Sequence, residues 1–207
     1  KTLEDLRGKR IGVESTALGA FFLSQALNTV GLQPSDVHIV SSEINEHERM
    51  FLQDLFDAVV TFEPVRSRLL GANAHLIFDS SQVPGEIVDV LVIAKDTLAH
   101  SPEAVDALLN GWFKALDYLN TRPREAAPLM ARRLRVSAEE VLASYKGLKL
   151  PDLDENLKLM AGSQAPLKKT ATKLAHAMSQ NKLLQKKITL TGFINPSVLE
   201  NMFASVP

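Results

Sequence analysis

Hydrophobic residues follow two alternating spacing patterns along the first part of the chain. Short apolar runs of strand length alternate with stretches in which apolar residues return every three or four positions. The second spacing places side chains on one face of a helix, whereas short apolar runs are typical of buried strands. Strands are predicted over residues 9–14, 37–40, 58–62, 75–78 and 88–94. Strands that alternate with helices indicate βαβ units, so the predicted fold class is α/β with a mainly parallel, doubly wound sheet.

The pattern changes after residue 94, where the strand-length runs stop and helical spacing continues. Ser101, Pro102 and Glu103 form a strong helix start, because serine caps, proline suits the first turn and glutamate favours the helix dipole. A Ser-x-x-Glu capping box over residues 137–140 begins another helix. Further helices are predicted over residues 123–134, 154–161 and 166–180, and from residue 197. We therefore predict an α/β lobe over residues 1–94 and a helical C-terminal half over residues 95–207.

The first predicted strand leads directly into a turn that could hold a ligand. The turn consists of Glu14, Ser15, Thr16 and Ala17. It lies where a strand ends and a helix begins, and open α/β sheets bind ligands at that edge. The first N–H groups of a helix lack partners and favour negative charge, so a carboxylate, sulfonate, phosphate or polarised heterocycle could bind there. The simpler interpretation is that Ser15 or Thr16 is an ordinary N-cap.

A second turn of the same kind follows the third predicted strand. Thr61, Phe62 and Glu63 lead into a helix that begins at Pro64 and ends at Gly71. The Glu63 carboxylate could accept a hydrogen bond from a ligand amine or hydroxyl. The simpler interpretation is a first-turn glutamate that complements the helix dipole.

Composition excludes several function classes. The chain contains no cysteine, which excludes disulfides, thiolate metal sites and cysteine nucleophiles. Its net charge is −1, which gives no strong field for binding nucleic acid or an anionic membrane. The first hundred residues carry six more acidic than basic side chains and the remainder five more basic than acidic, a distribution that indicates two separately solvated surfaces. No run approaches the ~18–20 apolar residues that a membrane-spanning helix needs.

The sequence shows no motif for metal, nucleotide or hydrolytic chemistry. HExxH, P-loop, GxGxxG and GxSxG patterns are absent from it, and its histidines are not paired at helical spacing. Glu43, Glu46, His47 and Glu48 could form a weak surface metal site, although a solvated helix face is the better interpretation. The lysine-rich stretch over residues 168–187 lacks the aromatics that single-stranded nucleic acid would need. We expect no metal, no cofactor and no nucleic-acid partner.

The order of these segments resembles a known family. Residues 5–13, DLRGKRIGV, are similar to the opening of the second lobe in ABC-transporter periplasmic solute-binding proteins of the nitrate/sulfonate/taurine and thiamine-pyrimidine-precursor type (NMT1/THI5-like). Later family motifs are matched in order by Ser15-Thr16, Gly31-Leu32, Asp57-Ala58, Glu63-Pro64, Pro102, Val105, residues 123–134 and residues 137–141. The chain departs from the family pattern at Asp54-Leu55-Phe56, at Phe62 and at Ala17-Leu18, and these departures leave the ligand's identity open.

The resemblance implies a periplasmic-binding-protein-like fold of type II, whose two lobes close on a ligand by hinge motion. In this fold residues 1–94 would be the α/β ligand-binding lobe, and the helical half over residues 95–207 would complete the other lobe. The implied ligand is a small anionic or heterocyclic solute, bound in an interlobe cleft for delivery to an ABC importer or for sensing. The implied contact residues are Glu14, Ser15, Thr16, Ala17, Thr61, Phe62 and Glu63. The implied partner is the transporter permease or a sensor module. The implied location is periplasmic, or extracellular and lipid-anchored.

The resemblance also implies that the N-terminal part of the first lobe precedes Lys1 and is missing from this sequence. Apolar side chains of the helical half, such as Trp112 and Leu116, would then be exposed, and a dimer or domain swap could cover them.

We expect a binding protein rather than an enzyme. The alternative is an enzyme on the same two-lobed fold, such as a thiamine-pyrimidine-precursor synthase or a transferase. It would need a nucleophile or an acid/base group in the cleft, where the sequence offers only Glu14, Glu63 and the hydroxyls of the turns. The effector-sensing domain of a transcription regulator is disfavoured, because the helical half is too long for it.

Overall fold

The computed structural model describes residues 2–14, 16–180, 184, 186 and 188–204. The chain forms two compact units. Unit 1 comprises Lys1–Ile87 and Leu174–Lys187, and unit 2 comprises Val88–Lys173 and Ile188–Pro207. The expected division into lobes after residue 94 stays a prediction.

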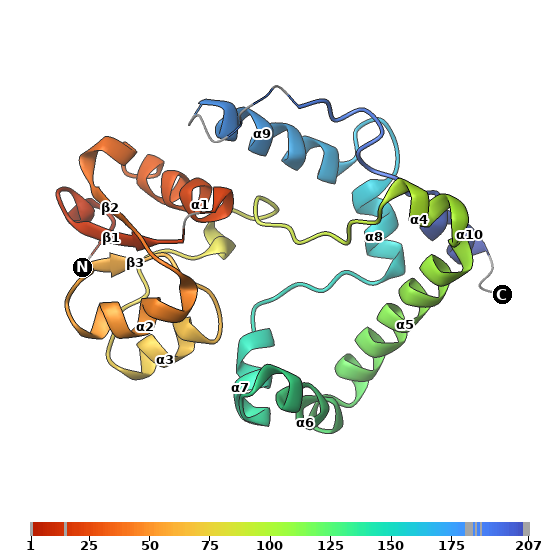
Figure 1. Ribbon diagram of the computed structural model, residues 1–207, viewed down its shortest axis with the longest axis horizontal. Helices are drawn as coiled ribbons and strands as arrows, with labels where there is room; N and C mark the ends of the chain where they lie inside the picture. Colours follow the sequence, from red (N-terminus) through yellow and green to blue (C-terminus); the bar gives the residue numbers. More distant parts are fainter. Residues whose placement is uncertain (1, 15, 181–183, 185, 187, 205–207) are drawn as a thin grey trace. The chain divides into compact units, whose positions relative to one another are not determined.

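Unit 1 is built on a parallel sheet. Within the described residues the sheet has three strands in the order β2-β1-β3 (Figure 1), namely β1 (Arg10–Val13), β2 (His38–Ser41) and β3 (Ala58–Val59). Ile11 pairs with Ile39 on one side and with Ala58 on the other, both in parallel register. The connecting helices are α1 (Ala17–Asn28), α2 (Ile44–Leu52) and α3 (Val65–Gly71). The predicted parallel, doubly wound arrangement is confirmed.

Successive residues of β1 face two different layers. Ile11 and Val13 join Leu23 and Leu27 of α1 in the buried core of the unit. Gly12 faces the other way, where the Phe56 ring would lie 2.5 Å from a β-carbon placed on this glycine. Figure 1 shows the same division, with α1 on one side of the sheet and α2 and α3 on the other.

Two of the five strand predictions are wrong. Residues 75–78 and 88–94 belong to no strand in the structure. Phe78 is buried because its ring packs against Phe22 of α1, with centroids 5.3 Å apart, rather than because it lies in a ladder. Val92 is 80% exposed, so no neighbouring strand covers it within the described residues. An apolar run becomes a strand only when another segment pairs with it, and periodicity alone does not supply that partner.

Short helical turns complete unit 1, and the third strand is shorter than predicted. The 3-10 turns are Glu4–Leu6, Pro34–Asp36 and Ser80–Gln82. Strand β3 stops at Val59, although the Val60 N–H still donates to the Gly12 carbonyl at 2.9 Å.

Unit 2 is helical, as predicted. Its helices are α4 (Lys95–His100), α5 (Pro102–Thr121), α6 (Pro123–Leu134), α7 (Ala138–Tyr145), α8 (Leu153–Met160), the first half of α9 (Pro166–Gln180) and α10 (Ser197–Ala204). The predicted capping box is confirmed, because Ser137 Oγ accepts from the Glu140 N–H at 3.1 Å and the Glu140 carboxylate accepts from the Ser137 N–H at 2.7 Å. Ser101 precedes α5 without a side-chain capping bond, so its predicted role as a hydrogen-bonding cap is wrong.

Three further sequence predictions concern the lysine-rich stretch, the exposure of apolar side chains in the helical half, and membrane-spanning helices. Lys182 and Lys187 of the lysine-rich stretch lie outside the described residues. Trp112 is 53% exposed, whereas Leu116 is buried. In the part of the chain that the structure describes, no helix is long and apolar enough to cross a membrane.

Candidate functional site

The turn after β1 is held together by the Thr16 side chain. Thr16 Oγ1 accepts a hydrogen bond from the Gly19 N–H at 3.3 Å and donates one to Glu14 Oε2 at 3.0 Å. The Thr16 N–H donates to the Glu14 carbonyl at 2.7 Å. Thr16 is therefore the N-cap of α1, as one of the two alternatives predicted. Ser15 lies outside the described residues, and the same holds for the side chain of Ala17.

Gly19 allows α1 to start close to the end of β1. A β-carbon at this position would lie 2.8 Å from the Val13 side chain and 2.9 Å from the Glu14 carbonyl oxygen. The helix N-terminus is therefore positioned directly beside the carboxyl end of the strand. The backbone N–H groups of Ala17 and Leu18 lie in the first turn, where the helix itself provides no carbonyl to accept their hydrogen bonds. This end of α1 can accept a negative or strongly polarised group.

In the turn after β3, the Glu63 carboxylate is hydrogen-bonded to the helix that follows it, α3. Glu63 Oε1 accepts from an Arg66 guanidinium N–H at 2.9 Å, and Oε2 accepts from the Ser67 N–H at 3.2 Å. These bonds match the simpler interpretation, a glutamate that stabilises the first turn of α3. Phe62 is half-buried beside it. The ligand-binding roles of Phe62 and Glu63 stay predictions.

Thr61 reaches inward to a buried histidine. Thr61 Oγ1 lies 3.1 Å from His47 Nδ1, and His47 is 0% exposed. Within the described residues neither His47 Nε2 nor Ser42 Oγ, both buried, has a hydrogen-bond partner. Burial lowers the pKa of His47, and the Ser42 carbonyl and then the Glu14 and Glu43 carboxylates act in the opposite direction. The prediction that His47 lies on a solvated helix face is wrong.

A signal for this burial was present in the sequence. Ile44, His47 and Phe51 recur at helical spacing, and Ile44 and Phe51 are partly buried in the structure. The side of α2 that carries these three residues packs inward, and His47 lies on it because of its position. The Glu46 and Glu48 carboxylates are instead paired with Arg49 and Arg68, respectively.

The structure thus brings the two predicted turns to the same edge of the sheet, because they follow the paired parallel strands β1 and β3. The Glu14 carboxylate acts on the His47 ring electrostatically, and Thr61 is hydrogen-bonded to it. Both turns belong to unit 1. No group of three or more His, Asp or Glu side chains that could hold a metal ion occurs among the described residues. The arrangement combines a helix N-terminus, a carboxylate and a hydroxyl, which suits recognition of a small polar molecule.

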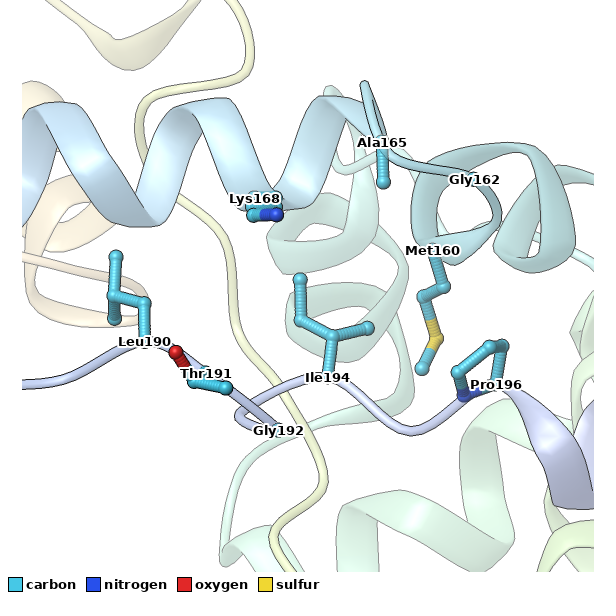
Figure 2. Close-up of a pocket in the computed structure, with 9 residues that line it drawn as sticks. All are labelled: Met160, Gly162, Ala165, Lys168, Leu190, Thr191, Gly192, Ile194 and Pro196. Carbon is cyan, nitrogen blue, oxygen red and sulfur yellow. The ribbon is translucent and has the colours of Figure 1, made fainter.

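A hollow of about 380 Å³ in unit 2 was not predicted from the sequence. Figure 2 shows α9 on one side of it, the segment 190–196 on the other, and Met160 of α8 at one end. Its lining consists of Met160, Gly162, Ala165, Lys168, Leu190, Thr191, Gly192, Ile194 and Pro196. Lys168 is the one ionic side chain of this set. Because ligand sites usually combine apolar walls with several convergent polar groups, the edge of the unit 1 sheet is the better candidate.

An ion pair fixes β1 beside the start of β3. Asp57 Oδ2 accepts from the Arg10 N–H at 2.8 Å and from Arg10 Nε at 3.1 Å. Hydrogen bonds from the Arg10 side chain and backbone lower the pKa of Asp57 from 3.8 to about 2. This pair holds in register the two strands whose ends carry Glu14 and Thr61.

Asp57→Asn should lower the free energy of unfolding at about pH 7 by about 1 kcal/mol, since solvent screens a pair whose carboxylate is 35% exposed. Because the folded pKa lies below the unfolded one, the stabilisation is present above 3.8 and disappears as the pH falls towards 2. Urea titrations at about pH 7 and about pH 3 should therefore show a smaller loss on acidification in the variant than in the parent chain. Asp106→Asn, an exposed change on α5, is the control. If acidification lowered the free energy of unfolding equally in the parent chain and the variant, the stabilising role of the Arg10–Asp57 pair would be contradicted.

Solved structures of known proteins share the fold of this chain. The periplasmic aliphatic sulphonate binding protein SsuA from Escherichia coli superposes with a TM-score of 0.73 at 16% identity, covering 97% of this chain and 66% of that chain. The desulfurization enzyme DSZB superposes with a TM-score of 0.67 at 17% identity, covering 98% of this chain and 72% of that chain. The periplasmic-binding-protein-like fold is therefore confirmed.

Sequence comparison agrees with the fold. A Brucella abortus (strain 2308) protein, named as a binding protein, is 24% identical over 163 residues, which cover 77% of this chain. The matched part is 51% of that relative, so the chain spans about half of its length. Residues 1–126 match the model of the family described as NMT1/THI5 like. Since this match covers more than half of the chain, the protein belongs to the NMT1/THI5-like family.

Proposed function

We propose that this chain binds a small anionic or heterocyclic solute at the carboxyl edge of β1 and β3. The observation that carries the proposal is the parallel pairing of β1 with β3, which places two strand exits at one edge. The first exit carries Glu14 and the α1 N-terminus, and the second carries Thr61, which is hydrogen-bonded to the buried His47. Open parallel sheets bind ligands at this edge, where helix N-termini and loop side chains converge. Glu14, Ser15, Thr16, Ala17, Thr61, Phe62 and Glu63 are the proposed contact residues.

The chemistry of the edge suggests how a solute is oriented. An anionic or polarised group binds the free N–H groups at the start of α1. Glu14 has no cationic partner among the described residues, so it is available to accept hydrogen bonds from the rest of the solute. A molecule with one anionic or electron-rich end and one donor end fits both features.

The proposed biological role is capture for an ABC importer, with sensing as the alternative outcome of the same binding event. Support comes from the E. coli structural neighbour, which is a periplasmic sulphonate-binding protein, and from the Brucella relative named as a binding protein. The proposed location is periplasmic or extracellular, and the proposed partner is the transporter permease or a sensor module.

An enzyme on the same fold is the second candidate, and two observations favour it. The desulfurization enzyme DSZB shares the fold. In addition, the Thr61 hydroxyl lies 3.1 Å from an imidazole nitrogen, which is the reach of an activated nucleophile and its base. However, such a base is normally oriented by a third group, and His47 Nε2 has no hydrogen-bond partner among the described residues. Binding without turnover is therefore the better supported function.

The proposal is tested by thermal shift with taurine, ethanesulfonate, nitrate, bicarbonate and 4-aminopyrimidine. A probe present at about 100 times its Kd should stabilise the chain by roughly 2.7 kcal/mol. Thr16→Pro removes the N–H that bonds Glu14 and the hydroxyl that caps α1. It should weaken binding about tenfold or more, because about 1.4 kcal/mol of lost interaction is a tenfold change.

Ser137→Pro is the matched control, because it removes the cap of α7 in unit 2 in the same way. It should lower stability without changing the affinity of any probe. Unchanged affinity in Thr16→Pro would place the binding site elsewhere. Consumption of a probe by the parent chain, with no thermal shift from any of the five, would favour the enzyme.

A further inference from the structure

Helix α6 and its neighbour α7 concentrate positive charge in unit 2. Residues 122–149, which cover both helices, carry seven basic and three acidic side chains, a net charge of +4, whereas the whole chain carries −1. Figure 1 shows the two helices packed against each other beyond the C-terminal end of α5. The charge of the whole chain, which gives no strong field for an anionic surface, therefore conceals a strongly basic segment.

The solvent-facing side of α6 carries arginines that lack counterions. The four exposed guanidinium groups on this side are those of Arg124, Arg132, Arg133 and Arg135. Residues three or four positions apart are neighbours on a helix surface, so positions 124, 128, 132 and 135 form one stripe, with position 133 beside it. None of the four forms an ion pair in the part of the chain that the structure describes. Glu125, the acidic residue of α6, is instead paired with Arg122 at 3.8 Å and accepts from the Tyr118 hydroxyl at 3.0 Å.

Two of these arginines lie where the helix itself disfavours them. Arg124 is the second residue of α6, where the positive end of the helix dipole repels a cation. Arg135 follows the last turn in the left-handed conformation, with a φ of 57°. Glycine is usual at that position, because a β-carbon is crowded there. The helix dipole accounts for Arg132 and Arg133 in the last turn, but the charge at both ends of the stripe is present despite a local cost.

Exposed apolar side chains accompany the arginines. Leu129 is 65% exposed and precedes Arg132 and Arg133 by three and four positions, so it is their neighbour on the helix surface. Leu134, in the last turn, is 53% exposed. An acidic protein surface would complement the charges alone. An anionic lipid surface complements both features, because its phosphates pair with guanidinium groups and leucine side chains are buried at the boundary between headgroups and acyl chains.

We infer that the arginine face of α6, defined by Arg124, Leu129, Arg132, Arg133 and Arg135, docks unit 2 on an anionic phospholipid surface. The arginines contact lipid phosphates, and Leu129 is buried just below them. Such a contact is peripheral and reversible, since it combines surface charges with a small apolar area. It does not involve the candidate site in unit 1 and goes beyond the proposed function. A solute-binding chain held in this way stays close to the membrane that contains an importer.

Co-sedimentation of the full chain with lipid vesicles tests the inference. The chain should bind vesicles of phosphatidylcholine with about 30% phosphatidylglycerol, should not bind phosphatidylcholine alone, and should dissociate when NaCl is raised from about 0.1 M to about 1 M. The double variant Arg132→Gln/Arg133→Gln should bind the anionic vesicles about tenfold or more weakly. Lys168→Gln/Lys169→Gln is the matched control, because it removes two adjacent exposed cations from α9 and should leave vesicle binding unchanged.

Two single variants separate burial of leucine and loss of folding from loss of charge. Leu129→Ser should weaken vesicle binding several-fold, whereas Leu108→Ser, at a 52% exposed position on α5, should not change it. Arg135→Gly places glycine in the left-handed conformation, so it should raise the midpoint of urea denaturation while it weakens vesicle binding. Loss of binding in this variant therefore cannot result from unfolding.

The outcomes separate this inference from the proposed function. The thermal shifts caused by the solute probes should be equal in the parent chain and in Arg132→Gln/Arg133→Gln. Failure of the parent chain to bind the anionic vesicles would overturn the inference alone. An equal loss in the arginine and lysine double variants would also overturn it, because net charge rather than α6 would then be responsible. Retention on immobilised polyglutamate without vesicle binding would assign the arginine face to an acidic protein instead.

Discussion

Leu27→Ala is expected to lower the free energy of unfolding by about 2–5 kcal/mol, the range for truncating a leucine in a closely packed core. Leu27 is 0% exposed and lies in the cluster formed by α1 and the β1 side chains Ile11 and Val13. The substitution removes apolar contacts and leaves a cavity beneath the helix that presents its N-terminus to the proposed site. Urea denaturation followed by circular dichroism measures the change.

Leu52→Ala is the matched control for this prediction. Leu52 is 53% exposed at the end of α2, and its truncation should change stability by no more than about 0.5 kcal/mol. A loss below about 1 kcal/mol for Leu27→Ala would mean that α1 repacks on the sheet, contrary to the tightly packed core of unit 1. Binding of the sulfonate probes should weaken in Leu27→Ala alone, since only this variant loosens the support of α1.

Local sequence signals predicted much of the fold, because the relevant physics is local. The Thr16 cap of α1 and the capping box of α7 each depend on groups within three or four residues of one another. The alternation of strands and helices in unit 1 likewise follows from periodic burial within each segment. These features required no knowledge of what lies next to them in space.

The failures concern contacts between distant residues. Residues 88–94 have strand composition, but pairing depends on another segment, and the exposed Val92 shows that no partner covers this run among the described residues. His47 was assigned to solvent because glutamates surround it in the sequence, whereas in space it is 0% exposed and packs against the Phe56 ring. Its bond to Thr61 joins residues 14 positions apart, and no motif connects them. The candidate site could therefore be predicted as two turns, but the bond from one of them to a buried imidazole could not.

Gly12 is the second position at which a small change should have a large effect. A β-carbon on Gly12 would lie 2.5 Å, 2.6 Å and 2.8 Å from three atoms of the Phe56 ring. Phe56 is 2% exposed and packs edge-on against His47, so the ring has little room to move away. Gly12→Ala should therefore lower the free energy of unfolding by about 1–3 kcal/mol through overpacking. Gly111→Ala on α5 is the matched control, because open space surrounds that position and alanine is the better helix former.

The cost of Gly12→Ala should also be coupled to Phe56. In the double variant with Phe56→Leu the ring is gone, so the alanine methyl group no longer meets it, and the combined loss should be smaller than the sum of the two single losses by at least about 0.5 kcal/mol. Additive losses would show that the strain arises elsewhere on β1. The same ring also packs edge-on against His47, with centroids 6.3 Å apart, so its displacement in Gly12→Ala should also shift the buried imidazole. The close approach of β1 to Phe56 thus contributes to stability and to the geometry of the buried imidazole through the same contact.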